Sequence, residues 1–331
     1  MSYEEYWLQK KNVVAVCEED DVIQFYVTKK LKKETLQRYV RTNMYGWTDD
    51  DIIQPKELVK IVTEKETTGK LKGYTTTRGV FKNTDVIEIG EVKAMGLPNR
   101  KQYRPLQPGC EISVERSFNV GTLGCFVKYY SFMGRKLTGQ LKSFVNMLSH
   151  FGIQPKEHVA ILTNNHVVNS NIFKPKMNTI VQPGGRNRSF GVAKTIYNST
   201  IDKHGINEID ASVCELTRDE YENITAYKNV TLRGPAMALN GEFVSKEGRT
   251  TGTTDGEVAA QNVSTNIKFG DDLVRFRGLI MSKHIVRPGD SGSVLVDRHN
   301  NVVGLIFAAS PSMGFAIPIQ KVLDDAGVEL I

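Results

Sequence analysis

The chain has 331 residues, 40% of them hydrophobic, and a formal net charge of +6. This length suggests two domains or a little more, and the hydrophobic fraction is sufficient for well-packed cores. The charge is modest, and the basic run at residues 27–38 has neither interleaved aromatic side chains nor a zinc-binding pattern. We therefore expect no nucleic-acid partner.

The amino-terminal sequence and the cysteines indicate the cellular environment. The opening segment, MSYEEYWLQKK, lacks the apolar core of a secretory signal, and no segment reaches membrane-spanning length. The four cysteines show no CxxC pair and no metal-ligand spacing, so we expect each to be a small buried hydrophobic residue. These features predict a cytoplasmic, reduced protein with no membrane contact, no metal and no cofactor.

Residues 1–97 are predicted to form a small α+β amino-terminal domain. Within it, the segment NVVAVCEEDDVIQFYVTKK, residues 12–30, is typical of two strands around an acidic turn. We find no recognisable catalytic set in this region. Residues 98–109 are rich in proline, glycine and basic side chains, which is typical of a linker.

From residue 110 onward, short runs of β-forming residues alternate with turns. This pattern predicts a mainly β barrel or sandwich domain over residues 110–331. Residues 134–152 interrupt it with apolar side chains at helical spacing. We interpret them as an amphipathic helix packed on its own barrel, with a partner-binding or gating helix as the alternative. Residues 319–330 predict a short closing helix.

The segment RPGDSGSVLVD, residues 287–297, places Ser291 in a glycine-rich turn before a predicted strand. Such a turn needs no chemical role, because glycine tolerates positive φ and Asp and Ser hydrogen-bond back to the chain. A serine becomes a nucleophile only when a base accepts its proton and another group orients that base. The turn can also supply the N–H groups of Gly289 and Ser291 to an oxyanion.

His166 is the candidate base among the six histidines. It follows the apolar run VAIL, residues 159–162, through a short polar turn, so it stands at the end of a predicted core strand. Asp210 is the candidate acid, because it lies in an alternating apolar and polar run typical of a strand. A buried carboxylate needs a partner, which His166 would supply. Asp202, in a polar loop, is the alternative acid.

Several segments together resemble the trypsin- and chymotrypsin-like serine proteases: ILTNNHVV, EIDASV, GDSGSVLVD and VVGLIFAASPSMGFAIPI. The similarity is greatest to the HtrA/Deg-like branch and to bacterial and plant proteins similar to the narrow-leaf type trypsin-like protease. It covers most of the chain and is strongest from about residue 104. The resemblance implies a mainly β, chymotrypsin-like double β-barrel with a cleft between the barrels.

The same resemblance implies a role for each candidate residue. His166 would be the general base, and Asp210 would orient it and stabilise its protonated form. Ser291 would be the nucleophile, and Gly289 together with Ser291 would form the oxyanion hole. His166 and Asp210 would belong to the first barrel and Ser291 to the second.

The sequence departs from the trypsin pattern in three respects. Ser293 stands where many trypsin relatives have glycine, no Ile-Val amino terminus follows a clear cleavage site, and no disulfide framework is evident. Asp290 is therefore not expected to serve a zymogen switch.

The residues near the candidate nucleophile indicate its specificity. Ile285, Phe307 and Ala309 are candidates for the primary pocket, and none of them is charged. We therefore expect an uncharged side chain rather than Lys or Arg at the cleaved bond.

The predicted function is a serine endopeptidase that cleaves proteins or peptides through an acyl-enzyme. A partner protein or a conformational change is expected to regulate it. The alternative is a latent, protease-like binding or scaffold module that works through its amino-terminal domain. The sequence leaves the oligomeric state open.

Overall fold

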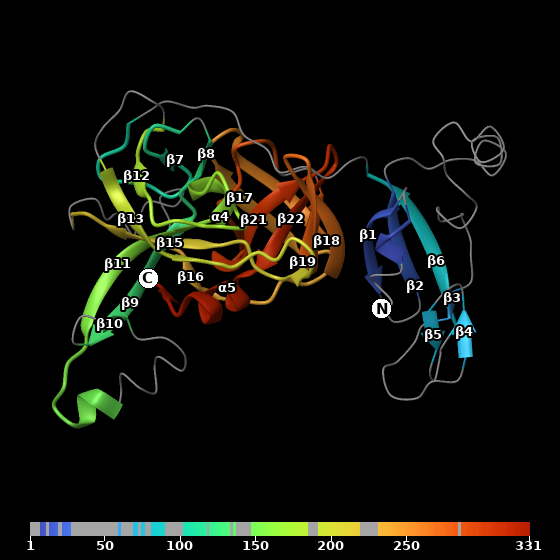
Figure 1. Ribbon diagram of the computed structural model, residues 1–331, viewed down its shortest axis with the longest axis horizontal. Coiled ribbons are helices and arrows are strands. Elements are labelled where there is room, and N and C mark those ends of the chain that lie inside the picture. The colour runs from blue at the N-terminus through green and yellow to red at the C-terminus, as the bar shows by residue number, and fades with distance from the viewer. Residues whose placement is uncertain are drawn as a thin grey trace.

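The computed structural model is built mainly of strands, most of them in two large curled sheets (Figure 1). A small separate hairpin joins β4 (Gly69–Leu71) and β5 (Tyr74–Thr76). The structure describes residues 7–10, 13–18, 22–27, 59–60, 69–71, 74–76, 81–89, 102–117, 119–132, 135–136, 147–184, 191–218, 231–283 and 286–331.

One sheet contains nine of the described strands, in the order β10-β9-β11-β15-β13-β12-β7-β8, with β23 also paired to β9. All these pairings are antiparallel. This sheet is the first barrel. Its strands are β7 (Glu111–Val114), β8 (Val120–Thr122), β9 (Cys125–Phe132), β10 (Arg135–Lys136), β11 (Lys156–Thr163), β12 (Thr179–Val181), β13 (Gly191–Asn198), β15 (Ser212–Leu216) and β23 (Glu329–Leu330).

The other sheet contains twelve described strands, in the order β14-β19-β22-β21-β20-β17-β18-β1-β2-β6-β3, with β16 paired to β21. A further pairing of β18 with β19 closes the strands from β17 to β22 into a ring, which is the second barrel. The strands of this sheet are β1 (Val13–Glu18), β2 (Val22–Val27), β3 (Val59–Lys60), β6 (Phe81–Glu88), β14 (Ile206–Asn207), β16 (Arg233–Pro235), β17 (Phe243–Gly248), β18 (Gly252–Phe269), β19 (Asp272–Lys283), β20 (Val294–Asp297), β21 (Asn301–Ala309) and β22 (Met313–Pro318).

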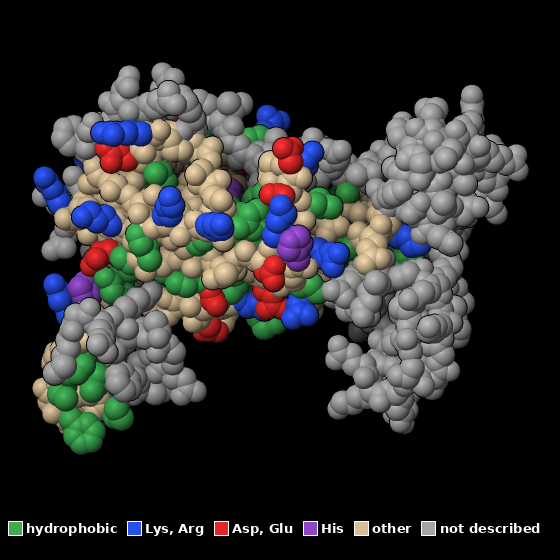
Figure 2. All heavy atoms as spheres, viewed as in Figure 1, with side chains coloured by type: hydrophobic (Ala, Val, Ile, Leu, Met, Phe, Trp, Pro, Cys, Tyr) green, Lys and Arg blue, Asp and Glu red, His purple; other side chains and the backbone are tan. Residues whose placement is uncertain are grey.

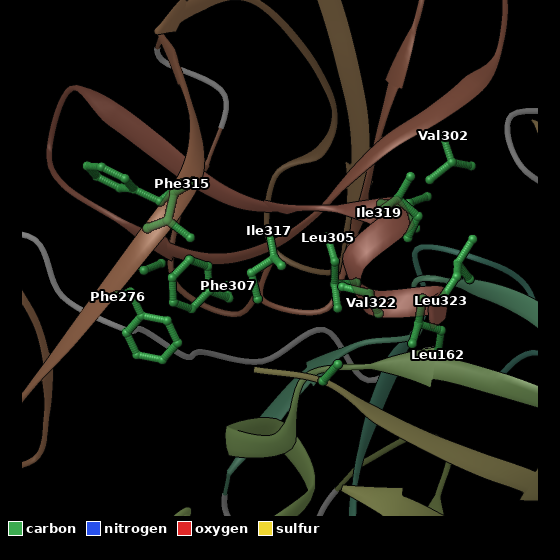
Figure 3. Close-up of a cluster of buried hydrophobic side chains, with 14 of the residues drawn as sticks. Leu162, Phe276, Val302, Leu305, Phe307, Phe315, Ile317, Ile319, Val322 and Leu323 are labelled. Atoms are coloured by element: carbon green, nitrogen blue, oxygen red, sulfur yellow. The ribbon is translucent and has the colours of Figure 1, made fainter. Parts of the chain in front are cut away.

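Two buried clusters explain why the barrels stay together. Successive side chains of β11 point to opposite faces of the sheet. Ile161 joins the cluster inside the first barrel, whereas Leu162 joins a larger cluster shared with the second barrel. Figure 3 shows Leu162 beside the second-barrel side chain Leu305 and the helix residue Leu323. The two barrels therefore share one hydrophobic core.

The described amino-terminal strands extend the sheet of the second barrel. β1 pairs antiparallel with β18, with Ala15 opposite Thr265. Next to this pairing, Asn266 Nδ2 donates to the Leu8 carbonyl oxygen and Cys17 Sγ donates to the Gln261 carbonyl oxygen, each at 3.0 Å. The two strands expected around an acidic turn are confirmed as β1 and β2. The division into an α+β amino-terminal domain, a linker and a protease domain stays a prediction.

Two of the described helices bear on the sequence predictions. α4 (Asn165–Val168) follows β11, and α5 (Ile319–Ala326) confirms the expected closing helix. Residues 147–150 are helical, but most of the predicted helical insertion lies outside the described residues. Phe151, which follows them in the chain, is exposed. Hydrophobic side chains gather on the arm below β10 in Figure 2. Of the helices in the described ranges, none is long and apolar enough to cross a membrane.

The four cysteines are all buried, as the sequence predicts, and none forms a disulfide. Burial raises the pKa of the Cys110, Cys125 and Cys214 thiols to about 12. These thiols therefore remain protonated at neutral pH and are not nucleophiles.

Candidate active site

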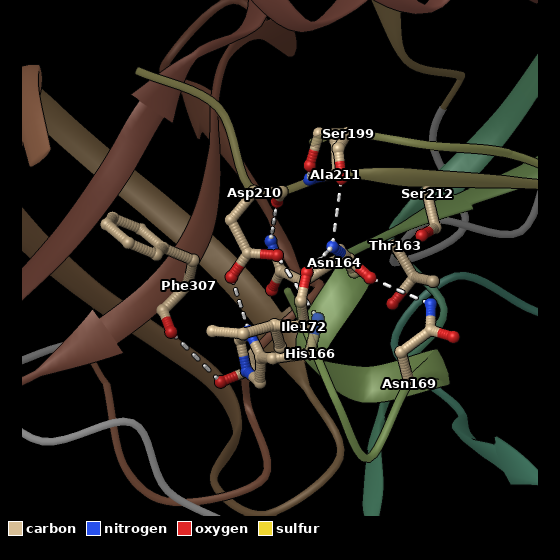
Figure 4. A network of polar contacts seen from close by, with 12 residues as sticks. Thr163, Asn164, His166, Asn169, Ile172, Ser199, Asp210, Ala211, Ser212 and Phe307 are labelled. Atoms are coloured by element: carbon tan, nitrogen blue, oxygen red, sulfur yellow. Dashed lines mark hydrogen bonds and ion pairs between the residues drawn. The ribbon is translucent and has the colours of Figure 1, made fainter. Parts of the chain in front are cut away.

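His166 and Asp210, which the sequence predicts to pair, are in direct contact (Figure 4). His166 lies in α4 and Asp210 lies just before β15. His166 Nδ1 is 2.5 Å from Asp210 Oδ2, and the His166 backbone N–H donates to Asp210 Oδ1 at 3.2 Å. Asp210 is fully buried, so its carboxylate depends on these bonds.

The pairing of β11 with β15 explains how the two residues meet. Thr163 ends β11 and pairs with Ser212, the first residue of β15. His166 and Asp210 therefore leave this pair of strands at the same end. Between them, the buried Asn164 side chain donates from Nδ2 to the Asp210 carbonyl oxygen at 2.7 Å and fixes the turn. Nothing in the sequence indicates this hydrogen bond beyond the polar character of TNNH.

The contact with Asp210 sets the tautomer of His166. An ionised carboxylate only accepts hydrogen bonds, so Nδ1 carries the hydrogen and donates it. The neutral ring then has Nε2 as an acceptor, and this buried atom has no hydrogen-bond partner among the described residues. The ring of Phe269, at the tip of the β18–β19 hairpin, meets the His166 ring edge-on with centroids 5.7 Å apart.

The loop before Ser291 has the features of a type II turn. The Asp290 N–H donates to the Arg287 carbonyl oxygen at 3.1 Å, with Pro288 and Gly289 between them. Gly289 has a φ of 92°, which the third position of this turn requires and which glycine adopts without strain. Within the described residues, neither the Gly289 N–H nor the Ser291 N–H donates a hydrogen bond. Both donors are therefore available to an anion.

Ser291 lies close to α4, with only Gly121 of β8 between them. The Thr122 N–H donates to the Ser291 carbonyl oxygen at 2.8 Å. A Cβ atom on Gly121 would lie 2.4 Å from the Val167 side chain and 2.9 Å from the Ser291 carbonyl oxygen. Only glycine fits in this space. Because Val167 directly follows His166, the close packing brings the two candidate residues to the same place.

The Ser291 hydroxyl itself has a different partner from the one expected. Ser291 Oγ donates to the Phe307 carbonyl oxygen at 3.3 Å, a bond drawn as a dashed line in Figure 4. No hydrogen bond joins Ser291 to His166 Nε2.

A buried ion pair supports the turn from below. Lys246 Nζ lies 3.2 Å from Asp290 Oδ2, and both side chains are fully buried. The Asp290 carboxylate also accepts the backbone N–H groups of Thr250 at 3.0 Å, Thr251 at 3.1 Å and Arg287 at 2.9 Å. An internal lysine thus compensates the aspartate beside Ser291, and no new amino terminus is needed for this. The sequence analysis missed Lys246 because nothing local links it to residue 290.

Thr122 in the first barrel holds the turn of the second. Its Oγ1 donates to the Gly289 carbonyl oxygen at 2.8 Å and accepts the Arg249 N–H at 3.1 Å. Its own carbonyl oxygen accepts Thr163 Oγ1 at 2.8 Å. One threonine of β8 therefore links the end of β11 with the turn before Ser291.

A cavity of about 540 Å³ adjoins His166. The β18–β19 tip contributes Lys268, Phe269 and Asp272, and the segment after α4 contributes Asn169 and Asn171. The lining is mixed: Phe173, Phe269 and three aliphatic side chains lie among polar ones, so the cavity could take a chain that offers both apolar groups and peptide groups to hydrogen-bond. Sequence reasoning did not find this cavity.

The other predicted site residues lie in less direct positions. Phe307 and Ala309 are buried in β21, and Phe307 meets Ser291 through its backbone rather than its ring. Ile285 lies outside the described residues. In the described part of the chain, no group of His, Cys, Asp and Glu residues could hold a metal ion.

Asp202, the alternative acid, has a local role. It is exposed, and its carboxylate accepts the N–H of His204 at 2.8 Å. The backbone N–H groups of His204 and Gly205 lower the pKa of Asp202. Its bonds close its own loop, and it makes no recorded contact with His166.

One protein family and several solved structures are similar to this chain. Residues 149–305 match the trypsin-like peptidase domain. No curated protein matches the chain. Similar solved structures include Thermobifida fusca Protease A (15% identity, TM-score 0.47) and Cellulomonas bogoriensis chymotrypsin (16%, 0.44). Each alignment covers 68% of this chain and 97% of the other.

The fold prediction is confirmed at the level of a mainly β, chymotrypsin-like double β-barrel. The matched segment contains His166, Asp210 and Ser291. This similarity to a trypsin-like peptidase domain supports a hydrolase of the serine protease class.

Proposed function

We propose that the protein is a serine endopeptidase with Ser291 as nucleophile, His166 as general base and Asp210 as the residue that orients the base. One observation carries the proposal. The His166 imidazole bonds a buried carboxylate, and the next residue, Val167, packs through Gly121 close to Ser291, whose turn presents N–H groups with no other partner among the described residues. Nucleophile activation and oxyanion stabilisation need these two parts.

The first step of the proposed mechanism activates the serine. Ser291 Oγ turns from the Phe307 carbonyl oxygen to His166 Nε2, which takes its proton as Oγ attacks the scissile carbonyl carbon. The imidazolium that forms is stabilised by Asp210, which keeps its negative charge because the proton stays on the ring.

The turn before Ser291 then stabilises the tetrahedral intermediate. The N–H groups of Gly289 and Ser291 donate to its oxyanion, and each such donor is worth about 10²–10³ in rate. His166 returns the proton to the leaving amine, and an acyl ester remains on Ser291. Water, deprotonated by His166, releases the acid product and restores the hydroxyl.

The pair of Lys246 and Asp290 supports a turn that is formed without proteolytic activation. Asp290 lies directly between Gly289 and Ser291, so its five polar contacts fix the backbone that carries both oxyanion donors. Lys246 is here a positioning residue, since it acts through Asp290.

The substrate is proposed to be a protein or peptide with an uncharged side chain at the cleaved bond. The cavity beside His166 would hold the neighbouring substrate backbone. We further propose membership of the HtrA/Deg-like branch, a cytoplasmic location and regulation by a partner protein or a conformational change. Support for regulation comes from the Ser291 hydroxyl, which rests on Phe307 rather than on the base.

That same resting position also favours the second candidate, a latent protease-like scaffold. The two are separated by reaction of the full chain with a fluorophosphonate and by hydrolysis of a library of peptides. An active endopeptidase gives an adduct on Ser291, located by peptide mass spectrometry, and this adduct and the peptide cleavage both disappear in Ser291→Ala. A folded protein that gives neither adduct nor cleavage would refute the proposed function and support the scaffold.

A further inference from the structure

A second serine, histidine and carboxylate meet at the other end of β11. Ser131 Oγ lies 2.8 Å from His158 Nε2, and His158 Nδ1 lies 2.9 Å from Glu215 Oε1. The three residues belong to β9, β11 and β15, which are adjacent strands of the first barrel. We propose that Ser131 is a second nucleophilic site, which accepts acyl groups from activated esters. This site does not depend on the function proposed for Ser291.

The strand registers explain why these side chains converge. Ser131 is opposite Lys156, two residues before His158, and Glu215 is opposite Ala160, two residues after it. Residues two apart on a strand share a face, so the serine and the glutamate are diagonal neighbours of the histidine on the same face. The arrangement is therefore fixed by paired strands rather than by loops.

The glutamate fixes the histidine tautomer needed for a base. A carboxylate accepts, so His158 Nδ1–H donates to Glu215 and Nε2 becomes the acceptor for the Ser131 hydroxyl. Tyr129 stacks on the imidazole with ring centroids 4.7 Å apart and planes 9° apart. Its hydroxyl hydrogen-bonds Glu215, and burial together with that carboxylate raises the pKa of Tyr129, so the phenol remains a donor. Glu215 is thus held by two partners.

The site is accessible to a small reagent. The His158 side chain keeps 18% of its surface exposed and Glu215 keeps 37%, and Ser131 is half-buried. On this face, Lys156 of β11 and Lys136 of β10 are opposite Ser131 in register, and Lys194 is opposite Glu215. A partly exposed hydroxyl with a preset base can react with an ester whose leaving group is good.

The reaction is a simple acyl transfer. Ser131 Oγ bonds to the carbonyl carbon of an aryl ester while its proton passes to His158 Nε2. The bond from the carbonyl carbon to the aryloxide breaks, and the imidazolium returns the proton to the aryloxide, which leaves as the phenol. The product is an ester on Ser131 and a neutral histidine, with no oxidant or further reactant needed.

The strand that carries Ser131 also limits what this site can do. β9 is paired with β10 on one side and β11 on the other at Ser131, so its N–H lies within a ladder and no oxyanion turn is present there. Losing such donors costs about 10²–10³ in rate for each. Peptide bonds should therefore be inert here, and the acyl-Ser131 ester should hydrolyse slowly and accumulate.

The test uses the full chain with Ser291→Ala, so that Ser291 contributes nothing. The protein is treated with p-nitrophenyl acetate at pH 8, and acetylated serines are quantified by peptide mass spectrometry. We expect acetylation of Ser131 at least tenfold faster than that of Ser117, a half-buried surface serine whose hydroxyl accepts the N–H of Asn119 and has no histidine beside it. Equal rates at the two serines would overturn the proposal.

Two further measurements distinguish a base from a structural histidine. His158→Gln in the same background should slow Ser131 acetylation at least tenfold and leave Ser117 unchanged. The pH profile covers the case in which this variant does not fold. In Ser291→Ala alone, the Ser131 rate should rise with pH in one step and then level off, as general-base catalysis requires, whereas the Ser117 rate should keep rising with hydroxide. A Ser131 profile parallel to that of Ser117 would refute the role of His158.

Discussion

Ser291 and Ser131 differ in which part of a serine nucleophile site they have, the contact with a base or the free backbone donors. The Ser131 hydroxyl already hydrogen-bonds a histidine that a carboxylate orients, whereas the Ser291 hydroxyl rests on the Phe307 carbonyl oxygen. The turn at Ser291, however, presents two N–H groups with no partner in the described residues, while the Ser131 N–H lies in a sheet ladder.

The difference shows which part of a serine protease site is hard to build. Cross-strand neighbours bring a serine, a histidine and an acid together on any antiparallel sheet face. Free backbone donors beside the serine require an interrupted ladder, a left-handed glycine and a buried ion pair to hold the turn. We therefore expect peptide hydrolysis at Ser291 and only reactions of activated esters at Ser131.

The largest expected effect is that of removing the proposed nucleophile. Ser291→Ala should lower peptide hydrolysis by on the order of 10⁶-fold, because the acyl-enzyme can no longer form. Steady-state peptide hydrolysis measures this, with Ser117→Ala as the control that leaves the rate unchanged. Cleavage that survives in Ser291→Ala would show that the two serines have been ranked wrongly.

Next is Asp210, the carboxylate beside His166: it is fully buried, whereas Glu215 beside His158 is 37% exposed. Asp210→Asn should reduce kcat by on the order of 10⁴-fold, because an amide favours the wrong imidazole tautomer. Asp202→Asn should change kcat by no more than a few-fold, since Asp202 bonds only its own loop. If the two variants exchanged severities, the acid would be misassigned.

The buried ion pair of Lys246 and Asp290 holds the turn before Ser291, and Ser131 has no such turn. Variants of Lys246 test how much this pair stabilises the protein. Lys246→Met leaves Asp290 buried without its counter-charge, which typically costs about 3–5 kcal/mol of unfolding free energy. Lys283→Met breaks an exposed pair with Glu257 and should cost less than about 1 kcal/mol. Urea unfolding of both variants gives the comparison, and equal losses would show that the buried pair is not a structural support.

The smallest effect is expected from the turn glycine. Gly289→Ala places a side chain at a φ of 92°, with a strain of about 1–2 kcal/mol. We expect a comparable loss in unfolding free energy and a fall in kcat of roughly tenfold or more as the turn relaxes and a donor rotates away. Gly234→Ala, where a Cβ meets nothing within 4 Å, is the control. An unchanged kcat in Gly289→Ala would contradict the proposed oxyanion donor.

Local patterns were sufficient to predict the main parts of the site. The apolar run before TNNH predicts a strand that ends near His166, and the structure places β11 there. The Gly-Asp-Ser-Gly sequence predicts the turn at Ser291. The strand expected around Asp210 begins later, at Ser212. Asp210 lies outside this strand because its carboxylate accepts hydrogen bonds from the backbone N–H and the imidazole of His166 in α4.

Long-range pairs could not be predicted in this way. Lys246 and Thr122 act on a turn far along the chain, and their sequences look like ordinary β-strand residues. The pairing of β1 with β18 likewise could not be predicted, because no local pattern links these two distant strands. The β18–β19 tip that brings Phe269 to His166 depends on the length and bulges of a hairpin.

The most direct test of the account is the site of the acyl-enzyme. The full chain is mixed with the p-nitrophenyl ester of a short uncharged peptide, quenched in acid within milliseconds and analysed by peptide mass spectrometry. We predict that the peptidyl group is on Ser291, with a nitrophenol burst that approaches one per chain when deacylation is the slower step. A peptidyl group found on Ser131 or another residue, with Ser291 unmodified, would contradict the account.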